Sequence, residues 1–221
     1  DIGMRHHDPT HRLKGFRIRN DGFHTWTDEE IAQFEVAHPI GTKARLAFSL
    51  LLFTGQRRGD VVVMGRQHVS GDRISVCQRK TTVRLSLPIH PTLQAVLFSA
   101  PSDNLTFLTT EFGKPFSPAG FGNWFRERCN EPGLNHCSAH GLRKAASRRL
   151  AEAGATNQQI TAVTGYRTDK EVSRYTAAAD QGRLADQAFN ALKGAERERN
   201  LANPDERLAN LSGNILKTRD S

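Results

Sequence analysis

The spacing of apolar and polar residues predicts a chain built mainly from helices. Residues 42–53 are nearly all apolar in their second half, which indicates a buried helix that ends at Gly55. A second apolar series with helical spacing predicts a helix over 139–153. Capping-box sequences at Thr27 and Thr156 mark the starts of two more helices.

Weaker signals complete the predicted fold. Pro, Ser and Gly punctuation predicts further helices at about 57–63, 91–99, 123–130, 170–178 and 184–192. Two short branched-apolar runs, Ile74–Gln78 and Val83–Leu87, flank a basic tetrapeptide and predict a β-hairpin with a basic tip. The predicted fold class is therefore mostly α with a small antiparallel β-sheet (α+β).

The chain divides into three predicted regions. Residues 1–25 carry little apolar periodicity, so we expect a basic linker from an N-terminal domain that lies outside this sequence. Residues 26–192 form the folded domain, and residues 193–221 form a tail that is mobile or docks on a neighbouring subunit. The cations of the linker could lie along a phosphate backbone; they are Arg12, Lys14, Arg17 and Arg19.

Composition points to a polyanionic partner. The formal net charge is +8, which favours nucleic acid, although a basic protein without such a partner is the plainer alternative. The sequence has neither a signal peptide at its start nor an apolar run long enough to cross a membrane. Its three cysteines have no framework spacing and fit reduced thiols, so we expect a bacterial cytoplasmic protein associated with the nucleoid.

One group of residues has the chemistry of zinc ligands. It consists of Cys129, His136, Cys137 and His140. The group contains no paired Cys-x-x-Cys, and a Pro-Gly separates its first two members. The sequence therefore predicts no metal site, and nothing in it indicates a cofactor.

Three short motifs supply groups that phosphodiester cleavage without metal requires. Such a reaction needs fixed cations beside the phosphoryl oxygens, a nucleophile, and an acid for the leaving oxygen. Thr54-Gly-Gln-Arg57 follows the buried helix, with Asp60 placed to hold Arg57. The other two motifs are His140-x-x-Arg143 and Gly165-Tyr166 followed by Tyr175. Each motif alone also has an ordinary structural explanation: a surface ion pair for the first, a polar helix face for the second and a packed tyrosine for the third.

Taken in order, these motifs resemble the tyrosine recombinase (phage integrase) family over about residues 26–190. The family pattern is T-G-x-R-x-x-E/D, a lysine on a β-hairpin, H-x-x-R, G-H or G-W, and then the tyrosine. The matching positions here are Arg57 with Asp60, Lys80, His140 with Arg143, Tyr166 and Tyr175. The resemblance implies the catalytic-domain fold of that family and a double-stranded DNA substrate. It also implies a protein that is a monomer when free and a homotetramer on DNA.

The resemblance implies a role for each residue. Arg57 and Arg143 would clamp the scissile phosphate, and His140 would hydrogen-bond a non-bridging oxygen and help as acid or base. Lys80 would protonate the leaving 5′-hydroxyl, and Asp60 would orient the site. Tyr175 would form a 3′-phosphotyrosyl link that a second strand's 5′-hydroxyl can reverse without ATP.

Two features depart from the family pattern or leave alternatives open. Tyr166 occupies the position of a His or Trp, although its hydroxyl could also donate a hydrogen bond to phosphate. Arg79 and Arg84 are neighbouring alternatives to Lys80 and further candidates for DNA contact. Two rival functions also stay open: a type IB topoisomerase, and a DNA-binding remnant without catalysis.

Overall fold

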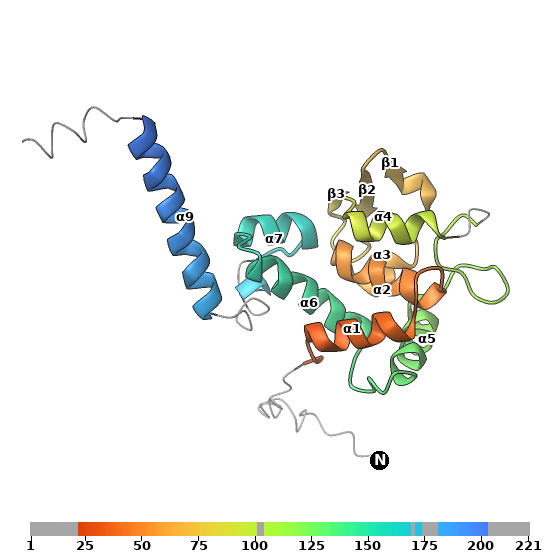
Figure 1. Cartoon of the computed structure of the whole chain (residues 1–221). Coiled ribbons are helices and arrows are strands. Elements are labelled where there is room, and N and C mark those ends of the chain that lie inside the picture. The colour runs from red at the N-terminus through yellow and green to blue at the C-terminus, as the bar shows by residue number, and fades with distance from the viewer. Residues whose placement is uncertain (1–21, 101–103, 169–170, 174–180, 203–221) are drawn as a thin grey trace, which may run out of the picture.

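The computed structural model describes residues 22–100, 104–168, 171–173 and 181–202. The elements, in chain order, are α1 (Asp28–Ala37), α2 (Lys43–Thr54), α3 (Arg58–Val61), a 3₁₀ turn (Arg66–His68), β1 (Val69–Ser70), β2 (Arg73–Cys77), β3 (Arg84–Pro88), α4 (Pro91–Phe98), α5 (Pro118–Asn130), α6 (Ala139–Glu152), α7 (Asn157–Thr164) and α9 (Gln181–Ala202). Figure 1 shows a helical body with the small sheet at one side and α9 at the other. The predicted fold class is confirmed.

The helix boundaries follow the local sequence signals. Thr27 and Thr156 form capping boxes at the starts of α1 and α7, because each side chain accepts the N–H of the third helical residue. Gly55 and Gly165 end α2 and α7 with φ values of 62° and 67°, a region that favours glycine. The predicted helix over 170–178 is described only at residues 171–173, which are helical.

The sheet is antiparallel throughout and has the strand order β1–β2–β3. Residues of β2 and β3 pair from Arg73↔Pro88 to Cys77↔Arg84, so the turn over 78–83 presents the predicted basic tip. Strand β1 and the preceding 3₁₀ turn were not predicted, since two and three residues are too short to show a periodicity.

Aromatic side chains hold the centre of the body together. Trp26, Phe34, Phe48 and Phe125 are fully buried and contact one another. The indole Nε1 of Trp26 also donates to the carbonyl oxygen of Ser138 at 2.9 Å. The segment that enters α1 is thereby fixed to the start of α6, which carries two predicted site residues.

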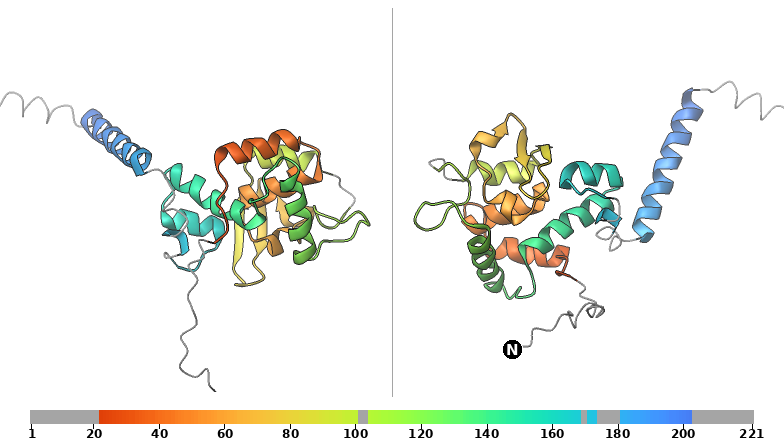
Figure 2. Two further views of the ribbon diagram at one scale, coloured as in Figure 1. Left: turned by 90° about the horizontal axis from the view of Figure 1, so that it is seen from below. Right: turned by 180° about the vertical axis from the view of Figure 1, so that it is seen from behind.

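Helix α9 projects from the body in all three views (Figures 1 and 2). Its described contact with α6 includes a hydrogen bond from Gln187 Nε2 to the carbonyl oxygen of Glu152, 2.7 Å long. The helix continues through residue 192 to Ala202, so the predicted tail begins inside a helix. The alternating acidic and basic residues after Gly194 are strong helix formers, which explains why the helix extends into the predicted tail. None of the described helices is long and apolar enough to span a membrane.

Candidate active site

Gln78 is the centre of a buried polar network at the base of the hairpin. Its Nε2 donates to Gln56 Oε1 and to the carbonyl oxygen of Thr164, both at 2.7 Å. Its Oε1 accepts from Arg57 Nη1 at 3.1 Å and from Thr81 Oγ1 at 2.6 Å. The side chain has no exposed area. One glutamine therefore ties Arg57, the hairpin and the end of α7 into one unit.

Gly165 makes this network possible. A Cβ at this position would lie 2.5 Å from Gln78 Nε2, closer than real contacts allow. The left-handed φ of Gly165 also disfavours a side chain. Two constraints therefore favour glycine directly before Tyr166: the close packing of Gln78 and the left-handed backbone that ends α7.

Asp60 holds the hairpin, in contrast to the expectation that it holds Arg57. Its buried Oδ1 accepts the backbone N–H of Arg79 at 2.9 Å, and among the described residues it makes no ion pair with Arg57. Arg57 is the N-cap residue of α3, and its side chain extends to Gln78 instead. Asp60 therefore fixes the hairpin backbone directly before Lys80, and it contributes to the site by positioning the hairpin.

Arg143 is almost completely buried and is held on two sides. Its Nη1 donates to the carbonyl oxygen of Gly55 at 2.7 Å, which satisfies the end of α2. Its guanidinium lies 4.3 Å from the centre of the Tyr166 ring, a cation–π contact. The Tyr166 hydroxyl oxygen is itself buried. Here the unusual tyrosine contacts Arg143 through its ring, whereas the sequence suggested a direct contact of its hydroxyl with phosphate.

His140 lies in the first turn of α6, where its ring packs against Phe23 with centroids 4.8 Å apart. Its pKa lies below the ordinary value, first because protein atoms partly enclose the ring and then because Arg143 and three other cations lie nearby. The neutral imidazole is therefore favoured at neutral pH.

The site contains an open cavity of about 650 Å³, and Tyr166 and Gln78 support it from outside its lining. Arg57, Lys80, His140 and Arg143 lie in its wall, although the chain separates the first and last by 86 positions (143 − 57). The lining holds six Lys or Arg side chains and one carboxylate, that of Asp60. Such an excess of cations around a single carboxylate suits a bound polyanion.

The comparison with known proteins agrees with this geometry. Residues 27–182, more than two thirds of the chain, match the phage integrase family. The chain belongs to the phage integrase family. The integrase of Escherichia phage HK022 is 27% identical over 161 residues, which cover 67% of this chain and 45% of that protein. The chain thus spans less than half the length of this curated relative.

Solved structures share the phage integrase fold. A lambda integrase (75–356) dimer bound to a COC′ core site superposes with a TM-score of 0.61 at 24% identity, over 72% of this chain and 60% of that one. A lambda integrase tetramer bound to a Holliday junction gives a TM-score of 0.56 at 24% identity, over 66% of this chain and 48% of that one. At these identities the likeness shows the fold.

The remaining predicted site residues do not all belong to the described part of the chain or to this cavity. Tyr175 and the linker cations Arg12, Lys14, Arg17 and Arg19 fall outside the described residues. Arg79 lines the cavity beside Lys80, whereas Arg84 lines a separate hollow next to β2 and β3. Arg84 is therefore the weaker alternative to Lys80.

Sequence reasoning missed four residues of the site. Arg126 and Phe23 line the cavity outside every motif that we singled out, and Arg58 lines it from an unspecified position of the first motif, to which no role was assigned. Gln78 did carry a signal, because Ile74 and Val76 are the buried positions of β2 and Gln78 continues their alternation. A polar residue at an inward position must find buried partners, and that inference would have indicated the network.

Proposed function

We propose that this chain is the catalytic unit, over about residues 26–192, of a site-specific DNA recombinase. It would cut and rejoin strands through a 3′-phosphotyrosyl link. The observation that carries the proposal is the cavity in which Arg57, Lys80, His140 and Arg143 meet in a domain of the phage integrase family. The substrate is double-stranded DNA. In the cell, this would be the DNA of the bacterial nucleoid.

The two anchored arginines supply the electrostatic part of the mechanism. Arg57 and Arg143 are anchored by Gln78 and by the Gly55 carbonyl, so they need little reorganisation when a phosphate enters. Both carry a fixed charge and can hydrogen-bond the non-bridging oxygens, whose negative charge grows during attack. Neutral His140 adds a further hydrogen bond. Because arginines hold this charge, we expect the cleavage chemistry to continue in EDTA.

The covalent step uses the tyrosine and the lysine. The Tyr175 hydroxyl gives its proton to a base, a role that neutral His140 can fill, and attacks phosphorus, forming the Oη–P bond while the P–O5′ bond breaks. Lys80 donates a proton to the departing 5′-oxygen. A 5′-hydroxyl from another strand then attacks the phosphotyrosyl phosphorus and releases Tyr175, so the number of phosphodiester bonds is conserved.

The chain close to Tyr175 is anchored next to the arginines. Val172 is fully buried against a small cluster that includes Ile160 and Tyr166. Arg167 donates from Nη2 to the carbonyl oxygen of Thr81 in the hairpin, 2.8 Å away. These contacts hold residues 167 and 172 on the side of the site where Arg143 and the hairpin lie, which supports the proposed role of Tyr175.

Assembly on DNA is the second part of the proposal. A lambda integrase has been seen as a tetramer on a Holliday junction, and we propose a homotetramer on DNA and a monomer in free solution for this chain. Phe189 and Leu192 on the projecting α9 are 65% and 53% exposed, which leaves an apolar surface for a neighbouring subunit.

The test is covalent trapping on nicked duplexes. Because the target site is undefined, the substrate is a pool with a randomised sequence around the nick, offered at low salt. We expect a denaturant-resistant protein–DNA adduct with the wild type and none with Tyr175→Phe, whose gel-shift binding stays within about twofold of the wild type. The absence of an adduct from the whole pool would argue for a binding-only remnant. An adduct that persists in Tyr175→Phe would instead move the role of nucleophile to Tyr166, the other tyrosine of the chain.

A second assay separates the recombinase from a topoisomerase. Adducts recovered from the pool identify preferred sequences, which are then placed on two DNA molecules. A recombinase yields joined or junction products, whereas a type IB topoisomerase yields relaxed circles alone. Relaxation without exchange would therefore favour the topoisomerase.

A further inference from the structure

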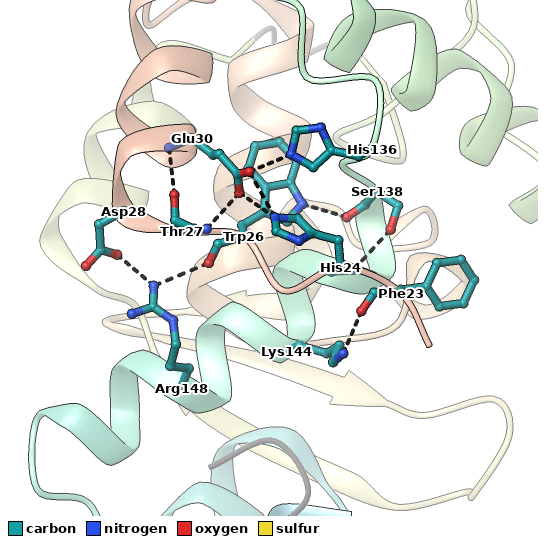
Figure 3. A network of polar contacts seen from close by, with 11 residues as sticks. Phe23, His24, Trp26, Thr27, Asp28, Glu30, His136, Ser138, Lys144 and Arg148 are labelled. Carbon is teal, nitrogen blue, oxygen red and sulfur yellow. Dashed lines mark hydrogen bonds and ion pairs between the residues drawn. The ribbon is translucent and has the colours of Figure 1, made fainter. Parts of the chain in front are cut away.

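Four metal-ligating side chains meet beside the active site without taking part in its proposed mechanism. They are His24, Glu30, His136 and Cys137, and their ligand atoms all lie within 4.8 Å of one another. His24 precedes α1, Glu30 lies in its first turn, and the other two precede α6. Figure 3 shows the two imidazoles pointing toward the Glu30 carboxylate from opposite segments of the chain.

The carboxylate is the centre of the group. His136 Nε2 lies 2.6 Å from Glu30 Oε1, and His24 Nε2 lies 2.9 Å from the same oxygen and 2.8 Å from Oε2. Glu30 Oε2 also accepts the backbone N–H of Thr27 at 2.8 Å, which fixes the orientation of the carboxylate. The Cys137 side chain is buried next to this group.

The donor set and spacing suit a tetrahedral transition metal. Two imidazole nitrogens, one carboxylate oxygen and one sulfur are common zinc ligands, with bonds of about 2.0–2.3 Å that place ligand atoms roughly 3.3–3.8 Å apart. To reach this range, separations of up to 4.8 Å would have to close and the hydrogen-bonded His–Glu distances of 2.6–2.9 Å would have to open, both by small side-chain rotations. A thiolate and a carboxylate would also balance the charge of one divalent ion.

This quartet differs from the group that the sequence suggested. Cys129 and His140 do not belong to it, and His24 and Glu30 take their places. The sequence could not indicate these partners because more than a hundred residues separate the two halves (136 − 30 = 106). The expectation of no metal site rested on that other grouping.

Neighbouring contacts hold the two halves in place. Gly141 lies where the first segment crosses α6, and a Cβ there would lie 2.2 Å from the carbonyl oxygen of His24. The hydrogen bond from Trp26 to the Ser138 carbonyl joins the same two segments. The quartet is therefore built on fixed backbone, as a binding site requires.

We propose that His24, Glu30, His136 and Cys137 bind one zinc ion, which fastens the segment before α1 to the start of α6. The ion would be structural, since all four positions are filled by protein ligands. Its effect on the active site runs through Phe23, the neighbour of His24, whose ring contacts His140 and lines the cavity. Binding would displace the thiol proton of Cys137 and leave both imidazoles neutral.

The experiment uses Co²⁺ as the spectroscopic probe on the whole chain, first stripped with a chelator. The chain has nine histidines, so stoichiometry alone would not locate the ion. A thiolate-to-cobalt charge-transfer band would locate it, because it reports a cysteine ligand. We expect this band to saturate at one Co²⁺ per chain, together with visible bands of tetrahedral intensity, and to vanish when Zn²⁺ is added.

Single substitutions assign the ligands. Cys137→Ser should remove the charge-transfer band, and His136→Ala should weaken Zn²⁺ binding by at least tenfold in a chelator competition. Cys77→Ser is the matched control, because it removes an exposed free thiol and should leave the band unchanged. If His136→Ala does not fold by circular dichroism, His24→Gln, in the entering segment, replaces it.

Thermal unfolding gives a readout that involves no DNA. Zn²⁺ should raise the unfolding midpoint of the wild type and of Cys77→Ser, and should have a smaller effect on Cys137→Ser. The proposal is wrong if no charge-transfer band forms, or if Zn²⁺ binds Cys137→Ser and His136→Ala as tightly as the wild type. In that case the four residues form a hydrogen-bonded cluster, and the proposed recombinase function is unaffected.

Discussion

The cations of the active-site cavity fall into two groups that differ in how they are held. Arg57 and Arg143 form the floor, where Gln78 accepts from Arg57 and the Gly55 carbonyl and the Tyr166 ring hold Arg143. The rim consists of exposed side chains, namely Arg58, Arg79, Lys80 and Arg126. The floor is organised before any ligand binds, whereas the rim can adjust its side chains to the DNA. We therefore expect the floor to control the rate of cleavage and the rim mainly to control binding, with Lys80 as the exception.

The largest expected effect comes from the floor. Arg143→Ala should lower the rate of adduct formation by about 10³–10⁵-fold, the range known for arginines that stabilise a phosphoryl transition state. It should also destabilise the fold by about 1–3 kcal/mol, because the Gly55 carbonyl loses its buried donor. Single-turnover cleavage and urea unfolding measure the two effects.

The matched control lies on the same helix. Arg149 is an exposed residue of α6 outside the cavity, so Arg149→Ala should leave the rate within about twofold. Similar losses of rate in the two variants would contradict the distinction between floor and rim.

Lys80 tests whether one rim residue takes part in the chemistry. Lys80→Ala should slow cleavage of normal DNA by about 10²–10⁴-fold, as loss of a general acid does. A 5′-sulfur leaving group departs without a proton, so cleavage of that substrate should be slowed by less than about tenfold. Parallel assays on the two substrates give the ratio. An equal loss on both would exclude Lys80 as the acid and direct attention to Arg79.

Gln78 tests how the floor is organised. Gln78→Leu removes four hydrogen bonds and leaves buried partners without one, so we expect a destabilisation of about 2–4 kcal/mol. Where the variant is still folded, cleavage should be slower by about tenfold or more, with DNA affinity nearly unchanged. Gln94→Leu, at an exposed position of α4, serves as control. A rate as high as that of the wild type would show that Arg57 needs no support from Gln78.

Much of the fold and the main residues of the site could be predicted from the sequence, whereas the contacts that support those residues could not. The helices and the hairpin follow from local signals, such as the capping box at Thr27 and the glycine after α2. The order of the motifs was enough to place Arg57, Lys80, His140 and Arg143 in one site. Their supports could not be predicted, because the contacts from Gln78 to Thr164 and from Arg143 to Gly55 join residues 86 and 88 positions apart. Asp60 shows the same limit, since proximity in sequence favoured Arg57 and the folded chain brings it to Arg79.

The smallest expected effect comes from the rim. Arg126→Ala should weaken DNA binding by a few-fold for all sequences and reduce the slope of log affinity against log salt by about one. Its cleavage rate at saturating protein should equal that of the wild type. Gel-shift titrations over a salt series measure the slope. Arg197→Ala, on the projecting α9, provides the control for loss of one exposed cation. A large loss of rate in Arg126→Ala would place this residue with the floor.

The central claim is that Tyr175 forms the covalent link while Tyr166 supports Arg143, and peptide mapping of the trapped adduct tests it most directly. The chain has two tyrosines, and trypsin separates them into the peptides 150–167 and 175–183. After nuclease digestion, mass spectrometry should find the nucleotide remnant on the peptide 175–183. A remnant on the peptide 150–167 would contradict the account, because it would make Tyr166 the nucleophile.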